Sequence, residues 1–203
     1  MKKRWMHKIV ERGRMPFATQ RPKDPYTGEK GDVAVYLDEL VYIIGVVGIN
    51  ELVQYHYGKQ MHEDTGALRL AIRVMTEMEL YAKELSEREG MEISFARTPA
   101  ETVAQRFAVA DILNKEFREK VLKVAKGDVE KSLSQINEPR DLPVYYTNGT
   151  HVPPHADISL AERIKIEHIF FPSVDGGDIM HIFLGEGYPD SRGIKSLAMK
   201  IAR

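Results

Sequence analysis

The hydrophobic positions along the chain alternate between short apolar runs and longer stretches with helical spacing. Val33 to Ile49 is apolar apart from Asp38 and Glu39, and it predicts a buried strand followed by a turn or a helix start. The longest helical pattern begins after Asp64 or Thr65 and ends at Gly90. Its apolar positions recur at helical spacing: Leu68, Ile72, Met75, Met78 (or Glu79), Leu80 and Leu85.

Between these patterns lie shorter strands and helices. Glu92 to Arg97 alternates polar and apolar residues, which predicts a strand. Thr98-Pro99-Ala100-Glu101 then has the composition of a helix start, with Thr98 as N-cap, Pro99 at the first helical position and Glu101 completing a capping box. The other expected elements are a helix from Glu51 closing at Gly58, a helical stretch to about Ile136 broken near Gly127, strands at Leu142 to Thr147 and Met180 to Leu184, a helix after the Ser159-Leu160-Ala161-Glu162 capping box and a final helix at Gly193 to Ala202.

Predicted strands and helices therefore alternate along the chain. Such alternation with long connections predicts an α/β fold with largely parallel strands and crossover helices. Residues 1–32 stand apart, because a basic amphipathic helix up to Arg14 precedes an exposed Pro- and Gly-rich connector from Pro16 to Asp32. We therefore expect this helix and connector at 1–32 and a single α/β domain at 33–203.

Composition narrows the range of functions. The formal net charge of -1 gives no support for a nucleic-acid or membrane partner, and no apolar run has the length of a membrane span. We therefore expect a cytoplasmic protein. Cysteine is absent from the sequence, so these residues form no disulfide, no cysteine-ligated metal site and no thiyl radical.

The segment Tyr145-Tyr146-Thr147-Asn148-Gly149-Thr150-His151-Val152-Pro153 is the first candidate site. A strand delivers two tyrosines into a turn with small polar side chains, and ligands of parallel α/β sheets bind beyond the carboxyl ends of strands. Backbone N–H groups of such a loop can hold phosphate, with hydroxyl and amide donors beside them. An ordinary polar turn is the alternative interpretation. No Walker-type lysine follows, which excludes a P-loop.

Two further patterns have structural alternatives. His151, His155 and Asp157 could ligate a metal, but Pro153 and Pro154 prevent the helix that would align the two imidazoles, so we favour loop histidines. Phe95 to Glu101 leads into a helix with Arg97 and Arg106 nearby, which would suit an anion at the helix N-terminus. The alternative is a capped crossover helix with solvent-facing arginines.

Four blocks occur together in one order: Gly45 to Glu51, Phe95 to Phe107, Tyr145 to Pro153, and Asp175-Gly176-Gly177 with His181. In this order the blocks resemble the anaerobic (class III) ribonucleoside-triphosphate reductases. The most specific are Thr-Pro-Ala-Glu-x-x-x-x-Arg-Phe at Thr98 to Phe107 and Tyr-Tyr-Thr-Asn-x-x-His at Tyr145 to His151. The resemblance extends from about Met15 to the end of the chain.

The resemblance implies a ten-stranded barrel of two five-stranded halves, of which this chain would supply a half barrel. It also implies a glycyl radical that generates a thiyl radical on a finger-loop cysteine, formate as reductant, a four-cysteine zinc site, ATP or dNTP effectors and a separate activase. None of these cysteines is in the sequence. We therefore interpret the chain as a late-barrel fragment without the finger-loop cysteine, zinc site and radical glycine, and assign it no catalytic residue, metal ligand or cofactor.

The resemblance assigns substrate-contacting roles to residues of this chain. It places Tyr146 (or Tyr145) near the reacting cysteine and Thr147, Asn148, Gly149 and Thr150 around the triphosphate, followed by His151. Gly149 stands where many relatives have Ser, and Asn50 lies in a matching block without an assigned role.

Three functions remain open. The first is part of a reductase for deoxyribonucleotide synthesis, contributing a substrate-site wall and inactive alone. The second is a subunit that complementing reductase chains complete, and the third is a stand-alone nucleotide-binding or interaction module that has lost catalysis. We expect weak or no binding of a ribonucleoside triphosphate by the chain alone. We also expect a homo-oligomer, because an opened barrel exposes strand edges.

Overall fold

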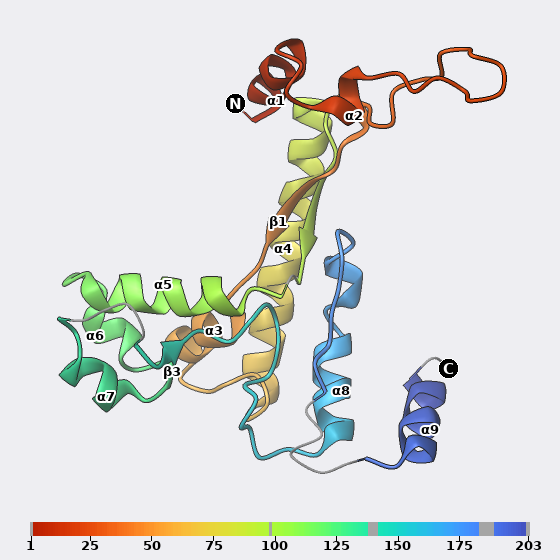
Figure 1. Ribbon diagram of the computed structural model, residues 1–203. Coiled ribbons are helices and arrows are strands. Elements are labelled where there is room, and N and C mark those ends of the chain that lie inside the picture. The colour runs from red at the N-terminus through yellow and green to blue at the C-terminus, as the bar shows by residue number, and fades with distance from the viewer. Residues whose placement is uncertain (1, 98, 138–141, 183–188, 202–203) are drawn as a thin grey trace.

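The computed structural model describes residues 2–97, 99–137, 142–182 and 189–201. A long helix forms the axis of the molecule, with an N-terminal arm at one end and most of the later helices beside its other half (Figure 1). The elements are α1 (Lys2–Glu11), α2 (Pro16–Thr19), η1 (Leu37–Glu39), β1 (Tyr42–Gly45), α3 (Ile49–Tyr57), α4 (Thr65–Glu89), β2 (Ile93–Ala96), α5 (Glu101–Leu113), α6 (Arg118–Val121), β3 (Lys126–Gly127), α7 (Val129–Ser134), β4 (Val144–Tyr145), α8 (Leu160–His168), η3 (Phe171–Ser173) and α9 (Ser191–Ile201).

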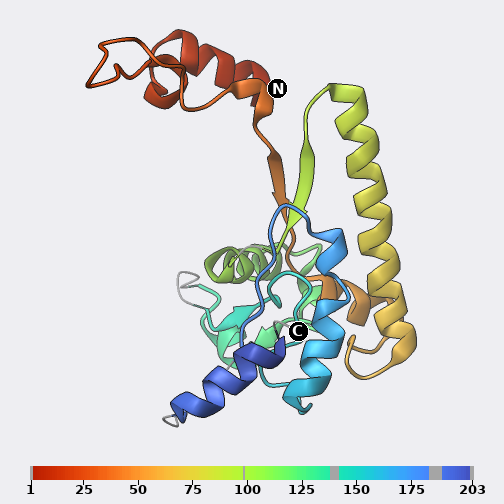
Figure 2. The ribbon, with the colours of Figure 1, turned by 90° about the vertical axis from the view of Figure 1, so that its right-hand side faces the viewer.

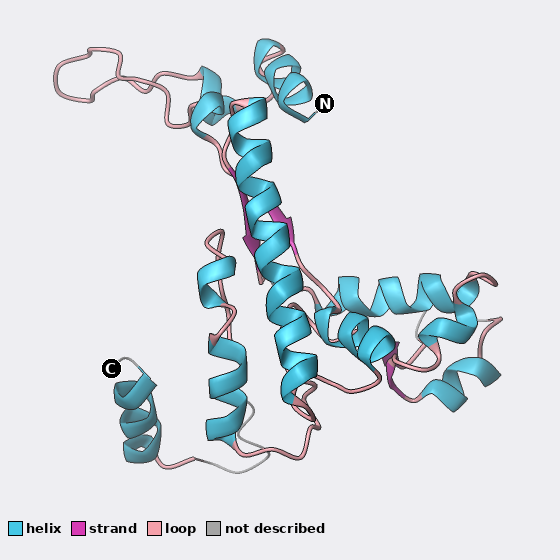
Figure 3. Cartoon of the chain, turned by 180° about the vertical axis from the view of Figure 1, so that it is seen from behind, coloured by secondary structure: helices cyan, strands magenta, loops and turns pink. Residues whose placement is uncertain are grey.

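The α/β class is confirmed, with less strand than expected (Figure 3). β1 and β2 pair in parallel, from Tyr42 opposite Ile93 to Gly45 opposite Ala96, and α3 and α4 form the crossover between them. β3 and β4 form an antiparallel pair of two residues each. Among the described residues the strands therefore make two two-stranded sheets, and a five-stranded half barrel is not seen.

The long helix α4 follows the sequence pattern closely. The side chain of Asp64 accepts the N–H groups of Gly66 and Ala67, and Gly90 ends the helix in the left-handed conformation at φ 60°. The buried stripe consists mainly of small residues, with Met75 among the alanines, which brings α3 and β2 close to the helix. Leu80, one of the apolar positions of the predicted helical pattern, is exposed because it lies off this narrow stripe.

Two expectations about the first strand and the helix α5 were wrong. The strand is not buried, since Ile43 and Ile44 are 51% and 44% exposed. Within the described residues β1 has one neighbour, β2, so much of its surface stays open. Helix α5 begins at Glu101, with Ala100 as an N-cap that makes no side-chain hydrogen bond, so Pro99 is not helical. Thr98, the expected cap, lies outside the described residues.

The two later strands also differ from expectation. Leu142 to Thr147 forms only the two-residue strand β4, because the backbone beyond it bonds elsewhere. The N–H of Tyr146 donates to the carbonyl of Ala104 at 3.3 Å, and the N–H of Gly48 donates to the carbonyl of Thr147 at 2.9 Å. Residues 180–182 form no strand, and residues 183 and 184 lie outside the described part. The capping box at Ser159 and Glu162 is confirmed at the start of α8.

Two hydrophobic clusters hold the body together. One joins α3, α4 and β2 to Phe170 and Val174, and the other joins α5 and α6 to the start of β4 around Leu142 and Val144. The arm formed by residues up to about 35 projects from this body (Figure 2). It contains the expected N-terminal helix as α1, followed by an exposed connector with the short helix α2. None of the described helices is long and apolar enough to cross a membrane.

We predict that Gly127→Ala destabilises the protein by about 3 kcal/mol. Gly127 has φ 93°, and a Cβ there would collide with the carbonyl oxygen of Pro143. That oxygen also accepts the N–H of Asp128, so it cannot move freely. Gly58→Ala is the matched control, because φ is 84° but a Cβ would meet nothing within 4 Å. Urea unfolding should show a loss of about 1 kcal/mol for the control. Equal losses in the two variants would contradict the steric argument.

Candidate functional site

Two of the sequence blocks come together around Gly48. The N–H of Gly48 donates to the carbonyl of Thr147 at 2.9 Å, and the N–H of Ile49 donates to that of Gly149 at 3.4 Å. Gly48 adopts φ 81° and faces the side chain of Tyr146, so a turn without a Cβ allows this close approach. The loop after β4 is thus attached to the start of α3.

Glu51, in the first turn of α3, fixes the start of this loop. Its Oε2 accepts the backbone N–H of Thr147 at 3.0 Å, and its Oε1 accepts the Thr147 hydroxyl at 2.6 Å. Lys126 Nζ lies 3.8 Å from Oε1, and burial lowers the pKa of Lys126 although Glu51 acts to raise it. The Thr147 hydroxyl therefore serves Glu51 and is not a free donor for a ligand.

Glu167, on α8, fixes the end of the loop and is fully buried. Oε1 accepts the N–H of Val152 at 3.0 Å, and Oε2 accepts Arg97 Nη2 at 3.1 Å. Burial raises the pKa of Glu167, while the Val152 amide and the two nearby arginines act to lower it. The carboxylate thus joins α8, the end of β2 and the loop.

The two arginines beside Glu167 are paired with protein groups. Arg163 donates to the carbonyls of Val152 and Pro153 at 2.7 and 2.9 Å. Arg97 is 1% exposed, and its Nε lies 3.2 Å from Asp178 Oδ1. The guanidinium groups therefore neutralise buried carboxylates and satisfy loop carbonyls, which are backbone acceptors without a strand partner.

His151 sits within this buried group. Its Nδ1 lies 2.7 Å from the carbonyl of Asn148, so this nitrogen carries the proton of the hydrogen bond. The ring stacks on His181 with centroids 5.7 Å apart. Burial lowers the pKa of His151 to about 4, and Arg97 acts in the same direction. His151 thus acts here as a neutral packing and hydrogen-bonding group.

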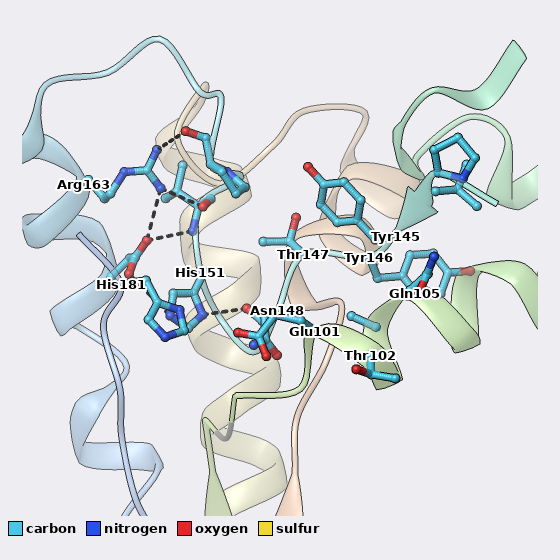
Figure 4. Close-up of a pocket in the computed structure, with 16 residues that line it drawn as sticks. Glu101, Thr102, Gln105, Tyr145, Tyr146, Thr147, Asn148, His151, Arg163 and His181 are labelled. Atoms are coloured by element: carbon cyan, nitrogen blue, oxygen red, sulfur yellow. Dashed lines mark hydrogen bonds and ion pairs between the residues drawn. The ribbon is translucent and has the colours of Figure 1, made fainter. Parts of the chain in front are cut away.

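A cavity of about 510 Å³ opens between this loop and the start of α5 (Figure 4). Five of the seven residues expected at a site line it: Tyr145, Tyr146, Thr147, Asn148 and His151. Gly149 and Thr150 are buried and are not part of the lining. Glu101, Thr102 and Gln105 form the α5 side. A cavity of this volume suits a small ligand of nucleotide size.

The two tyrosines point to different partners. The Tyr146 hydroxyl donates to Asp111 Oδ2 at 2.7 Å, and burial and this bond raise the pKa of Tyr146. The Tyr145 hydroxyl forms a hydrogen bond with His155 Nε2 at 2.8 Å. Gly149 adopts φ 51°, and a Cβ there would lie 3.1 Å from Arg97 Cγ. Any larger residue, such as the Ser implied by the resemblance, would press on the buried arginine.

The other sequence patterns have different outcomes. In the ranges that the structure describes, no group of three or more His, Asp or Glu side chains could hold a metal ion. Arg97 is directed to Glu167 and Asp178, which leaves it unavailable for the expected anion, and Arg106 is exposed. Asn50 now has a structural role, because its Nδ2 donates to Gln60 Oε1 at 3.0 Å and its Oδ1 accepts the N–H of Met61.

Sequence reasoning missed Glu51, Arg163 and Glu167. The one available signal for the last two is their separation of four residues on a helix, which permits an ion pair. Nothing in that spacing says that the pair is buried. Glu51 is the last residue of the block from Gly45, but in the sequence it resembles an ordinary first-turn acid.

We predict that Arg97→Met lowers the free energy of unfolding by about 3 kcal/mol, because it leaves Glu167 buried with one arginine fewer. Arg106→Met is the matched control on the exposed face of α5 and should change stability by less than about 0.5 kcal/mol. Chemical denaturation of the two variants would check this. A loss for Arg97→Met no larger than that of the control would show that the buried pair contributes nothing.

The pKa of His151 predicts a pH-dependent stability. In the unfolded chain this group takes up a proton near pH 6.5, whereas in the folded protein it stays neutral until about pH 4. The unfolded state therefore binds more protons in this window, and stability falls by up to about 3 kcal/mol as the pH drops through it. His151→Gln should remove this part of the dependence, measured by urea unfolding at several pH values. His168→Gln, at an exposed position, should keep it. An unchanged pH profile in His151→Gln would be inconsistent with a buried neutral imidazole.

The comparisons with known proteins agree with the sequence blocks. The family model of the anaerobic ribonucleoside-triphosphate reductases matches residues 1–203. A search of curated proteins found no match to the chain. Because the family model covers the complete sequence, the chain belongs to the anaerobic ribonucleoside-triphosphate reductase family.

Proposed function

We propose that the chain contributes one wall of a ribonucleoside-triphosphate site in anaerobic ribonucleotide reduction. The observation that carries this proposal is the cavity of about 510 Å³ between the loop after β4 and the start of α5. In a family that acts on nucleoside triphosphates, a cavity of this size at that loop is the natural place for substrate.

The chemistry of the lining supports a phosphate on the α5 side. The first N–H groups of a helix have no intrahelical partner and carry the positive end of the helix dipole. Thr102 lies in this first turn, and both Thr102 and Glu101 line the cavity. Asn148 adds a side-chain amide whose nitrogen and oxygen have no hydrogen-bond partner in the described part of the chain. We infer that the phosphates meet the amide and the helix start, while Glu101 opposes the negative charge.

Tyr146 is proposed to lie next to the reacting ribose. Its raised pKa keeps the phenol protonated, and its bond to Asp111 holds the ring in place. The hydrogen-atom chemistry needs a thiol that these 203 residues do not contain. The residues present also do not fit the four-cysteine zinc site of the family, and we derive no step through zinc or the glycyl radical.

We infer further that the chain is inactive alone and is completed by other reductase segments or by a second copy. The exposed apolar residues of β1 support this, because strands with open edges and open apolar faces are rarely left uncovered. In the barrel that the family implies, β1 and β2 would be two neighbouring strands of one half.

A second candidate function is a stand-alone nucleotide-binding module. It is favoured by one observation, namely that the cavity is lined on both sides by residues of this single chain. The two functions differ in the affinity expected for the isolated chain. A single wall should bind CTP with a Kd of about 1 mM, whereas a module should bind in the micromolar range.

We predict weak CTP binding that depends on Asn148. Titration of the isotope-labelled chain with CTP, followed by NMR, should shift the amide signals of the loop after β4 and of the start of α5. Asn148→Ala should weaken binding by about tenfold, because a hydrogen bond to a charged phosphate is lost. Asn114→Ala is the matched control, since Asn114 is exposed at the far end of α5.

Each result decides between the proposals. Micromolar binding would favour the module over the substrate-site wall. Shifts that avoid the cavity, or no shifts up to about 10 mM CTP, would rule out nucleotide binding at this site.

A further inference from the structure

A second pocket lies on the other side of Tyr146 from the substrate cavity. It is an open hollow with a volume of about 320 Å³, lined by α3, α5 and the residues around α6. Tyr146 lines both this pocket and the substrate cavity, so its side chain is a shared wall. Glu51, which fixes Thr147, also lines the second pocket.

The walls of the second pocket are aromatic. Tyr55 comes from α3, Phe107 from α5 and Phe117 from the residue before α6, and they are 43%, 53% and 39% exposed. Lys120 Nζ lies 5.7 Å from the centre of the Phe117 ring. Aromatic side chains from three separate elements thus converge on one hollow and leave much of their surface uncovered. Such walls favour a flat ligand that stacks or packs edge-on against them.

One polar group in this pocket can select among flat ligands. Asp111 lines the pocket, and its Oδ2 accepts the hydroxyl of Tyr146 at 2.7 Å. Within the described ranges Tyr146 is the one hydrogen-bond donor to this carboxylate, so Oδ1 has capacity for a second N–H. A carboxylate oxygen accepts and does not donate, and it therefore recognises an amino group rather than a carbonyl.

We propose that this pocket binds a planar nitrogen heterocycle with an exocyclic amino group, stacked on the aromatic walls and donating to Asp111. The volume suits one fused ring system. A ligand there would contact the face of Tyr146 opposite the substrate cavity and the carboxylate that holds its hydroxyl. This binding does not rest on the proposed function.

Adenine and purine are a matched pair of probes, because they differ by the amino group. Titration of the full chain, followed by ligand-observed NMR, should give a Kd of about 1 mM or tighter for adenine. Purine should bind about tenfold more weakly, since it lacks the charge-assisted hydrogen bond. Equal binding of the two, or no adenine binding up to about 10 mM, would overturn the proposal. Tighter binding of butylamine than of adenine would show a simple cation site instead, and would overturn it too.

Variants test the two components of the pocket. Asp111→Asn keeps an acceptor for Tyr146 but offers an amide N–H to the ligand, so the preference for adenine over purine should disappear. Phe107→Ala removes a wall and should weaken adenine and purine alike. Leu113→Ala, an exposed residue on α5 that does not line the pocket, should change neither. If Asp111→Asn does not fold, the adenine and purine comparison on the unaltered chain still decides the proposal.

Asn148→Ala separates this inference from the proposed function. It should weaken CTP binding and leave adenine affinity unchanged. Loss of adenine binding in that variant would place adenine in the substrate cavity and refute a second site. Adenine binding without any CTP binding would refute the proposed function and leave the second site standing.

Discussion

The burial of Glu167 is the constraint on which the site depends. An ionised carboxylate without exposure to water is costly unless charges and hydrogen bonds compensate it. Arg97 comes from the end of β2, Arg163 from α8 itself and the Val152 N–H from the loop, so compensation requires that all three segments meet. Burial still raises the pKa of Glu167, which shows that the compensation is incomplete. A buried ion pair contributes little net stability, but removing one partner is strongly destabilising, and this favours a single arrangement.

The same compensation explains how a loop without strand partners keeps a defined shape. Between Tyr146 and Pro154 the backbone bonds partly to the backbone of Gly48, Ile49 and Ala104 and partly to side chains. Glu51 accepts the N–H of Thr147, Glu167 accepts that of Val152, and Arg163 donates to three successive carbonyls beginning at Val152. Because these side chains belong to α3 and α8, their hydrogen bonds hold the loop in a fixed position relative to the two helices. Such support is what a preorganised binding site requires.

The sequence predicted what depends on local chemistry. The ends of α4 at Asp64 and Gly90, and the capping box of α8, follow from residues a few positions apart. The length of the last predicted strands depended on distant partners, since Tyr146 bonds to Ala104 on α5 and not to a strand. Five of the seven expected site residues line one cavity. The charged groups that position them could not be identified from the sequence, because acidic and basic residues are usually exposed and no local pattern shows which of them are buried. The sequence predicted that Arg97 would bind an anion near the site. Arg97 does lie near the site, but its anionic partner is the carboxylate of Glu167.

The pairing of these charges has a consequence for the way a triphosphate could bind. Arg163 is the one Lys or Arg that lines the cavity in the described part of the chain, and it is bonded to loop carbonyls and paired with Glu167. Glu101 and Glu167 add two carboxylates to the same lining. A polyanion would therefore rely on neutral donors, namely Asn148 and the first turn of α5, whose contributions are individually small. For the substrate-site wall that we propose, strong binding of a triphosphate would then need positive charge from outside these residues, because the cavity lining has no unpaired cation in the described part of the chain.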